Sequence, residues 1–303
     1  MPYRIPEGFS CDTIAIRGPV DEQNNLCNFE EIAKKATGNK KLAMFKADID
    51  NLGLVFTSSW GEGDESRISF SRYAQLSRHL HYFFSAYVSG FIKAHDEYRD
   101  TIYTVFSGGD DLCVLGAWDA VMRFALDFRN ELTTFANGNP SITLSGGIAL
   151  ADSKLPVRAI AAAAEEALEH AKKRKDETSN KVAKDAVSVF GVTVSWAEYE
   201  KSLKDAKAIV EHMDSGKVSY AVVYKMIDFA NRARDVREGR KIIRDSLWMS
   251  NYRYVLARNI KQEHENVLKF FQRFGSPDLM EKSRIAVSYA LYLNREGKEE
   301  DDA

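Results

Sequence analysis

The stretch IYTVFSGGDDLCVL, residues 102–115, decides how this chain is expected to fold. Two runs of β-forming residues, Ile102–Phe106 and Leu112–Leu115, enclose a turn that contains two glycines and two aspartates, which is the pattern of a β-hairpin. Glycine suits such a turn because it adopts positive φ at little cost, and because the missing Cβ lets a ligand approach the backbone. The sequence therefore predicts a hairpin whose tip presents two adjacent carboxylates.

The residues around the hairpin predict an α+β domain. Apolar residues alternate in the strand regions and recur at helical spacing between them. Over about residues 40–191 the expected order is β-α-β-β-α-β-α-β. The expected elements are a short helix over 29–36, strands over 42–48, 142–150 and 187–190, and helices over 71–94, 119–135 and 157–175, with Ser71 and Asp119 as helix caps.

The chain changes character after Gly191. Helical stretches separated by glycines replace the strands, which predicts a second, all-helical domain. The expected division is an irregular segment over 1–40, the α+β domain over 41–193, the helical domain over 194–295 and an acidic, solvated tail over 296–303. The expected helices cover residues 196–213, 218–239, 247–261, 263–274 and 279–295.

Positive charge accumulates in the helical part. Residues 199–295 hold 19 Lys/Arg against 12 Asp/Glu, a formal charge of +7. Closely spaced basic residues here are candidates for contact with RNA or with another subunit, and a solvated helix face is the alternative. These residues are Arg232, Arg234, Arg237, Arg240, Lys241 and Arg244.

Composition excludes two broad classes of protein. A chain of 303 residues with 45% hydrophobic and 11% aromatic residues and a net charge of -2 can collapse around a core, so it is not mainly disordered. Its apolar runs fall far short of the ~20 residues that span a membrane, and the N-terminus lacks the apolar stretch of a signal peptide, so a soluble, cytoplasmic protein is expected. Three cysteines without a Cys-x-x-Cys pair agree with a reducing compartment, with a Cys11–Cys27 metal or disulfide pair as the alternative.

Acidic residues also end the first strand of the domain, at Asp48 and Asp50. Alternation places both on one side if the strand continues, or Asp50 in the following turn. If this strand pairs beside the hairpin, Asp48 lies close to Asp110 and Asp111. Carboxylates so close repel one another unless cations lie between them, and Mg²⁺ prefers oxygen ligands in sites that also bind phosphates. We therefore expect two divalent ions at these three acids, with Ile49 among the residues that contact them.

Candidate phosphate-binding groups lie around these acids. The backbone amides of Asn51, Leu52 and Gly53 would point at phosphate oxygens if a helix begins there. Lys172, near the end of its expected helix, and Lys181 would neutralise phosphates as point charges. Each feature also has an explanation that involves no ligand. The Gly-Gly-Asp-Asp turn could be an ordinary chain reversal, and Lys172 could reflect the general preference of helix C-termini for lysine.

These motifs together resemble one family, the large subunit of type III CRISPR effector complexes of the Csm type (type III-A). The resemblance covers about residues 28–295, and it is the order of the motifs, rather than any single one, that is specific. The matching stretches are ADIDNLG at 47–53, SFSR at 69–72, SGGDD at 107–111, GGI at 146–148, AK at 171–172, LW at 247–248 and LARN at 256–259.

The resemblance implies a ferredoxin-like palm of the polymerase and nucleotide-cyclase type, the second palm of such subunits, followed by a C-terminal helical domain. It implies that ATP, with Mg²⁺ or Mn²⁺, is converted into cyclic oligoadenylates when the complex holds guide RNA and a matching target RNA. A ribose hydroxyl of one ATP would attack the α-phosphate of another, and pyrophosphate would leave. The implied roles are metal ligands and catalytic residues for Asp48, Asp110 and Asp111, the turn under the triphosphate for Gly108 and Gly109, an adenine contact for Ser107 and a phosphate contact for Lys172.

The chain also departs from the family. The HD nuclease domain, the first palm and the zinc-binding insertion of such subunits are not visible, and His95-Asp96 lacks companion histidines, so nuclease activity is not expected. Cyclase-type sites form between two palms. We therefore expect partners that include other Csm-type subunits and a chain that supplies the first palm and HD domain, or else a longer chain of which this is a fragment. No membrane partner is expected.

Two other functions are compatible with parts of the sequence. A diguanylate cyclase shares the palm and acts on GTP, but Asp111-Leu112 replaces the Glu-Phe of its usual motif, and its Phe-Lys-x-x-Asn-Asp stretch is absent. A catalytically silent scaffold of an RNA complex would use the basic helical part alone, but the intact carboxylates argue against a loss of catalysis.

Overall fold

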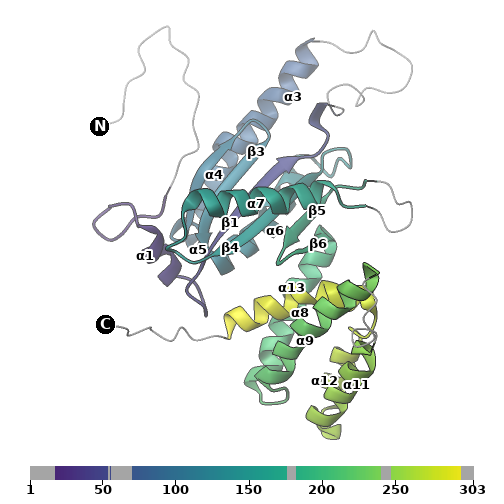
Figure 1. Ribbon diagram of the computed structural model, residues 1–303. Helices are drawn as coiled ribbons and strands as arrows, with labels where there is room; N and C mark the ends of the chain where they lie inside the picture. Colours follow the sequence, from purple (N-terminus) through teal and green to yellow (C-terminus); the bar gives the residue numbers. More distant parts are fainter. Residues whose placement is uncertain (1–17, 54, 56–69, 176–181, 240–246, 295–303) are drawn as a thin grey trace, which may run out of the picture.

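The structure is a computed structural model, and it describes residues 18–53, 55, 70–175, 182–239 and 247–294 (Figure 1). Its first part is built on a six-stranded sheet with the order β2-β3-β1-β4-β5-β6. β4 and β5 are parallel, and the other neighbouring strands are antiparallel. The strands are β1 (Leu42–Ile49), β2 (Ile102–Gly108), β3 (Asp111–Ala117), β4 (Leu144–Ala151), β5 (Ala186–Val189) and β6 (Val192–Ser195). The predicted order of elements is confirmed, with one further strand.

Helices cover both faces of this sheet. They are α1 (Phe29–Lys34), α3 (Phe70–Tyr82), α4 (Val88–Ala94), α5 (Asp96–Arg99), α6 (Trp118–Phe135) and α7 (Val157–Lys172). Because side chains alternate along β1, Phe45 packs edge-to-face against Phe124 of α6, whereas Met44 shares a smaller core with Ile160 of α7. Figure 1 shows α7 crossing the sheet, and it is this face that carries the site described below.

The long helix between β1 and β2 is confirmed in extent, but it differs in two details. A π-helical turn, Phe83–Tyr87, separates α3 from α4. The Ser85 hydroxyl donates to the carbonyl of His81, four residues earlier, a bond that bends helices because it competes with the backbone ladder. The helix begins at Phe70, so the prediction of Ser71 as its N-cap is wrong, and Ser71 lies inside the first turn.

The prediction of Asp119 as a helix cap is also wrong. Ala117 occupies the N-cap position of α6, and Asp119 lies in the first turn with a nearly buried carboxylate 3.3 Å from the Arg123 guanidinium. The helix begins earlier because Trp118 is anchored there, its indole N–H donating to the carbonyl of Thr37. The helix α7, in turn, ends at Lys172, three residues before the predicted end.

The additional strand, β6, follows a tight reversal of the chain. Phe190 and Gly191 both adopt positive φ, 54° and 74°, and return the chain from β5 into β6 as an antiparallel pair. The alternating residues 192–195 directly after a glycine are the sequence signal for this hairpin. The prediction missed the strand because the segment is only four residues long and precedes a strong helix.

The helical part begins at once after β6. Ser195 accepts a hydrogen bond from the amide of Glu198, and the Glu198 carboxylate accepts one from the amide of Ser195, which forms a capping box that starts the first helix. The five predicted helices are all present. They are α8 (Trp196–Asp214), α9 (Tyr220–Arg237), α11 (Trp248–Asn259), α12 (Glu265–Gln272) and α13 (Pro277–Leu293). Among the described helices, none combines the length and apolar content needed to cross a membrane.

The last helix returns to the sheet domain (Figure 1). Tyr289 of α13 packs against Trp118 with ring centroids 5.0 Å apart, and the amide of Asn39 donates to the carbonyl of Tyr292 at 2.9 Å. The larger hydrophobic core is therefore continuous from the sheet into the helical part.

Candidate active site

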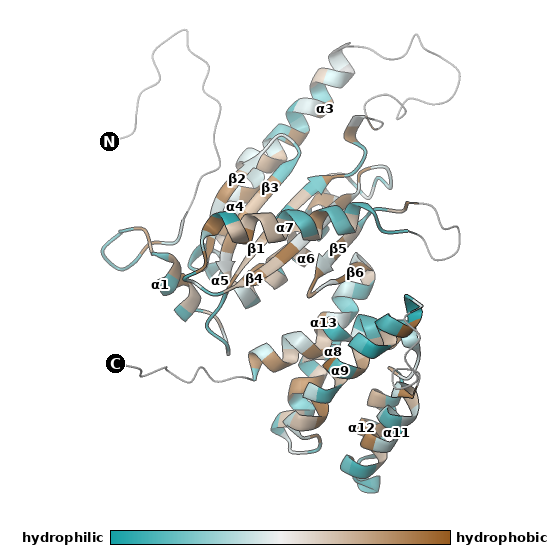
Figure 2. Ribbon diagram, in the orientation of Figure 1, coloured by the Kyte–Doolittle hydropathy of each residue, from teal (hydrophilic) through white to brown (hydrophobic). Residues whose placement is uncertain are grey.

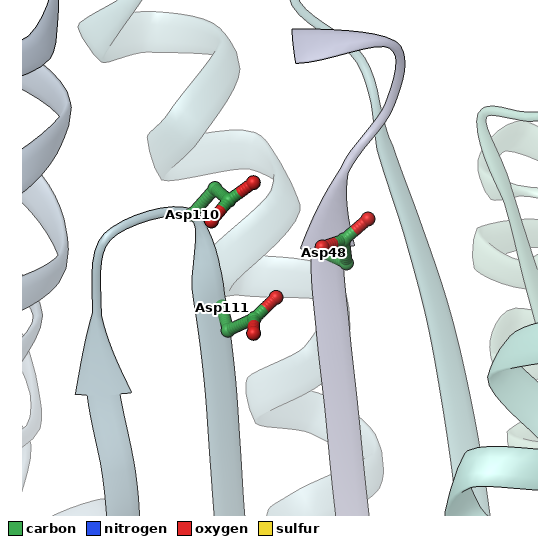
Figure 3. Close-up of side chains that lie close together, drawn as sticks. All are labelled: Asp48, Asp110 and Asp111. Carbon is green, nitrogen blue, oxygen red and sulfur yellow. The ribbon is translucent and has the colours of Figure 1, made fainter. Parts of the chain in front are cut away.

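Three carboxylates converge at one edge of the sheet. Asp48 ends β1, and Asp110 and Asp111 lie at the tip of the β2–β3 hairpin beside it (Figure 3). In the antiparallel register Asp48 is directly opposite Asp111, and one oxygen from each of the three acids lies within 4.8 Å of the others. The Ile49 amide donates to the Asp110 carbonyl at 3.3 Å and joins the end of β1 to the tip. The predicted convergence is confirmed.

The hairpin tip is the tight turn that the glycines predicted. Gly108 pairs with Asp111, which leaves a two-residue turn of Gly109 and Asp110. Gly109 has φ +67°, a conformation that residues with a Cβ rarely adopt. A Cβ at Gly109 would meet no atom within 4 Å, so the backbone conformation, and not crowding, requires glycine at this position.

The electrostatics of the cluster favour a bound cation. Burial, a hydrogen bond with Asp48 and repulsion from Asp48 and Asp110 raise the pKa of Asp111 to about 7. Like charges directly opposite each other in a sheet destabilise it, and a divalent cation removes that repulsion. Among the residues that the structure describes, the cluster holds three hard oxygen donors and no His or Cys ligand, a set that suits Mg²⁺ or Mn²⁺ better than Zn²⁺. The donor set therefore fits the expected metal.

Lys172 reaches this cluster from the last turn of α7. Its Nζ lies 2.7 Å from an Asp48 oxygen, and both side chains are largely buried. Burial opposes the charge on Lys172, but the hydrogen bond to Asp48 and the surrounding carboxylates outweigh it and raise the pKa of the lysine. Lys172 therefore remains a cation at the edge of the site, where an anionic ligand would approach.

The two aspartates that end β1 are separated by the fold. Asp50 lies in the turn after the strand and is 1% exposed. Its carboxylate accepts hydrogen bonds from the Ser145 hydroxyl at 2.7 Å, the Thr143 hydroxyl at 2.9 Å and the Asp185 amide at 3.0 Å. Burial raises its pKa, and these bonds act in the opposite direction. Of the two placements that the sequence allowed, the turn is the right one.

The segment after Asp50 has the helical start that the phosphate prediction required. Asn51 has φ 53°, and the amide of Val55 donates to its carbonyl at 3.0 Å, so a helical turn begins at Leu52. Lys184, which the sequence did not single out, donates to the Asn51 side-chain oxygen at 2.7 Å. Contact of the 51–53 amides with phosphate stays a prediction.

Ser107 is placed differently from its implied role as an adenine contact. It is 4% exposed, and its hydroxyl donates at 2.5 Å to the carbonyl of Phe84 in the π-helical turn. Ser107 therefore faces the larger core at Phe84, whereas its neighbour Phe106 lines the hollow that Asp48 and Asp111 also line. An adenine contact by this hydroxyl would require that bond to break.

Other predicted residues lie away from the cluster or outside the described residues. Lys181, Arg240, Lys241, Arg244 and Cys11 fall outside them. Of the remaining basic residues, Arg232 pairs with Asp228 and Arg237 pairs with Glu281. These pairs reduce the charge that the C-terminal end of α9, hydrophilic in Figure 2, offers to RNA. Contact of this segment with RNA or a subunit stays a prediction.

The family model and the similar proteins found by comparison all point to Cas10-type proteins. Residues 41–183 match the model of the second palm domain of Cas10/Cmr2. A Cas10/Csm1 protein of subtype III-A from Methanocaldococcus jannaschii, named a single-strand-specific deoxyribonuclease, is 36% identical over 214 residues, 65% of this chain and 25% of the relative. Its counterpart from Enterococcus italicus is 30% identical over 268 residues, 86% of this chain and 31% of the relative. The chain thus spans about a quarter to a third of the length of these relatives.

Solved structures share the same fold. Csm1 of T. onnurineus superimposes with a TM-score of 0.69 at 22% identity, over 97% of this chain and 44% of that one. A Csm1–Csm4 cassette in complex with cA4 gives a TM-score of 0.66 at 21% identity, over 93% of this chain and 40% of that one. At this identity the likeness concerns the fold, and it includes the helical part as well as the sheet domain.

Proposed function

We propose that this chain, whose residues 41–183 match the second palm domain of Cas10/Cmr2 and which is similar to type III-A Cas10/Csm1 proteins, makes cyclic oligoadenylate from ATP as a subunit of an RNA-guided effector complex. One observation carries the proposal. Asp48, Asp110 and Asp111, from two distant stretches, meet within 4.8 Å on this palm. A catalytic palm needs such a cluster, whereas a scaffold has no use for three mutually repelling carboxylates.

The three aspartates would hold two divalent cations, Mg²⁺ or Mn²⁺. Such ions, when bound, lower the pKa of an attacking hydroxyl and stabilise the charge that develops on a leaving pyrophosphate. The role of the chain is to place the carboxylates. Pairing of β1 with β3 holds Asp48 opposite Asp111, and the Gly109 turn directs Asp110 to the same point. No side-chain nucleophile is required, because the attacking group is a ribose hydroxyl.

Lys172 would neutralise the triphosphate of the bound nucleotide. Its ammonium group already lies 2.7 Å from Asp48, so it is within one side-chain length of any phosphate that the cluster holds. Lysine acts here as a point charge that follows the phosphates through the reaction. Gly109 is exposed, and a Cβ there would meet no atom within 4 Å, so this side of the hairpin tip leaves room for the triphosphate.

ATP is the proposed substrate, and the relatives' structures support this choice. Csm1–Csm4 cassettes have been solved with one ATP and with cA4. The partners we propose are guide RNA, target RNA, other Csm-type subunits and the first palm and HD domain, with the complex located in the cytoplasm. Target RNA would act by shifting the arrangement of the palms, because it does not take part in the chemistry.

We propose nucleotidyl transfer at the aspartate cluster, and we propose no nuclease activity for the His95-Asp96 dipeptide. The His95-Asp96 dipeptide lies at the junction of α4 and α5. The His95 ring is hydrogen-bonded to the carbonyl of Phe91 at 2.9 Å, and the Asp96 carboxylate pairs with Arg99 at 2.6 Å. Both side chains thus make local contacts that end one helix and start the next.

The test is product formation by the effector complex assembled with this chain. With Mg²⁺, guide RNA and target RNA, the wild-type complex is expected to release pyrophosphate from ATP and to form cyclic oligoadenylate. Asp110→Ala with Asp111→Ala removes two metal ligands, and we expect a loss of more than roughly 100-fold, since changes beyond the ligands of a metal already cost up to that much. Assembly of the complex should be unchanged.

Glu265→Ala is the control, because this glutamate lies on α12 in an exposed pair with Lys269. Its complex should keep wild-type activity. Turnover of GTP but not ATP would assign the chain to a cyclase of the diguanylate type. Product that persists in the double variant would show that the carboxylate cluster is not the site.

A further inference from the structure

The carboxylate cluster is bordered by hollows on both faces of the sheet. The first, of ≈440 Å³, lies between the β1–β3 face and α7, and Asp48, Asp111 and Lys172 form its polar end. The second, of ≈420 Å³, lies on the α3 side, where Asp110 and Arg78 contribute to its lining. Each has a volume typical of small-molecule sites. The first is lined by Asp48 and Asp111 of the cluster and the second by Asp110, so the two hollows meet the cluster from opposite faces.

A β-bulge shapes the first hollow. Thr104 pairs with Val114 and Phe106 with Cys113, so Val105 is an extra residue in β2. The bulge leaves two consecutive apolar side chains exposed, Val105 at 39% and Phe106 at 49%, and both line the hollow. Bulges are common next to active sites because they redirect side chains. The exposure of two adjacent apolar side chains to water is unfavourable in free energy, and a ligand that covers them would remove this cost.

The lining is divided into an apolar shelf and a charged end, where Asp48 and Asp111 would hold metal ions and Lys172 would contact phosphate. Phe106, Met44 and Cys113 form the apolar part, and burial raises the pKa of the Cys113 thiol to about 11, so the thiol stays neutral. The Phe106 ring also lies 3.7 Å from the position a Cβ would take on Gly108, which places it next to the hairpin tip. A flat apolar surface beside a charged end that would hold metal ions and phosphate suits a nucleotide, which has a flat base and a phosphate chain.

We propose that the Val105–Phe106 shelf holds the purine base of one of the two nucleotides that react at the cluster, with the base stacked on Phe106. This inference rests on the proposed function, which requires two nucleotides to meet at one metal site. Hollows on opposite faces of the sheet let two bases lie apart while a hydroxyl of one nucleotide reaches the α-phosphate of the other. The shelf supplies stacking, which recognises the flat face of a base.

Fluorescence of Phe106→Trp in the full chain tests the binding directly. A purine stacked on the new indole should quench its emission. AMP with Mg²⁺ should therefore quench the variant, and tripolyphosphate with Mg²⁺, which has no base, should not. Tyr224→Trp is the control, because Tyr224 is 62% exposed on α9, far along the chain from the shelf. Equal quenching of both variants, or quenching by tripolyphosphate alone, would overturn the proposal.

Kinetics of the assembled complex give the second measurement. Loss of base stacking in Phe106→Ala should raise KM for ATP by roughly 5- to 150-fold with little change in kcat, because binding is lost equally in ground and transition states. Phe106→Tyr should restore most of the affinity, and Tyr224→Ala should leave KM unchanged.

The outcomes separate this inference from the proposed function. If the wild-type complex forms no product but AMP quenches Phe106→Trp, the shelf is a nucleotide site and the proposed reaction is wrong. If the wild-type complex is active and Phe106→Ala has an unchanged KM, the reaction stands and the shelf proposal fails. An indole signal that responds to the partner subunits but not to AMP would show that a protein side chain covers the shelf instead.

Discussion

Asp48 and Asp50, two residues apart, have opposite environments. Asp48 faces α7 and the hairpin tip, where its carboxylate meets two others and Lys172. Asp50 is buried, and it accepts hydrogen bonds from Ser145 of β4 and from Asp185, the residue before β5. These bonds tie the turn after β1 to β4 and to the start of β5. One aspartate is therefore available to a ligand, whereas the other is used to hold the backbone that carries the first.

Asp50→Ala should lower the free energy of unfolding by about 2 kcal/mol. The substitution leaves the hydroxyl of the fully buried Ser145 without its acceptor, and an unpaired buried donor costs roughly 1–3 kcal/mol. Urea denaturation of the full chain measures the change. Glu265→Ala is the control, since its exposed ion pair with Lys269 contributes less than about 1 kcal/mol. A loss no larger than that of the control would mean that the Asp50 hydrogen bonds do not stabilise the fold.

At the scale of elements, the position of α7 depends on a glycine in β4. A Cβ on Gly147 would lie 2.2 Å from the Leu168 nitrogen and 2.4 Å from the Ala164 oxygen, both backbone atoms of α7. Backbone atoms of a packed helix cannot move aside as a flexible side chain does. This close approach sets the height of α7 above the sheet, and with it the reach of Lys172 and the depth of the hollow over β3.

Gly147→Ala should therefore cost about 3 kcal/mol, the upper part of the range for overpacking, and should also lower nucleotidyl transfer because Lys172 moves with α7. The free energy of unfolding and product formation are the two measurements. Gly90→Ala is the matched control. Gly90 is exposed in α4, a Cβ there meets nothing within 4 Å, and alanine should stabilise the helix by up to about 1 kcal/mol. Equal effects of the two substitutions would contradict the close-packing argument.

At the scale of the whole molecule, the sheet and helical parts are joined by one core. Trp118 of α6 contacts Tyr289 and Tyr292 of α13, and the indole of Trp196, at the start of α8, donates to the carbonyl of Leu144 in β4. The helical part therefore shares its hydrophobic core with the sheet and is not an independently packed domain.

We expect the chain to unfold in a single transition, and Tyr289→Ala to lower the stability of both parts together by about 3–5 kcal/mol, the usual cost of removing a buried aromatic ring. Far-UV circular dichroism and tryptophan fluorescence should give coincident curves for the wild type and the variant. Tyr224→Ala, at a 62% exposed position, should leave the midpoint unchanged. Separate transitions for the two signals would show that the parts fold independently.

The predictions from sequence succeeded where the decisive interactions are local. Strand alternation in β1, helical spacing in α6 and the two-glycine hairpin all depend on residues within a few positions of one another. The errors arose at helix starts, which the type of a single residue does not decide. Ser71 and Asp119 are good caps by residue type, but the anchoring of Trp118 on Thr37 moved the start of α6.

The sequence by itself determined the order of strands and helices, the tight turn at Gly109 and the identity of the three carboxylates, because backbone preferences and charge are properties of short segments. Only the tertiary structure decided which aspartate of the β1 end is buried, where Lys172 finds its partner and which face carries the Phe106 shelf. Each of these depends on contacts between segments far apart in the chain, such as the bond of Asp50 to Asp185 and the approach of α7 to Gly147. Burial and desolvation arise only when such segments pack together.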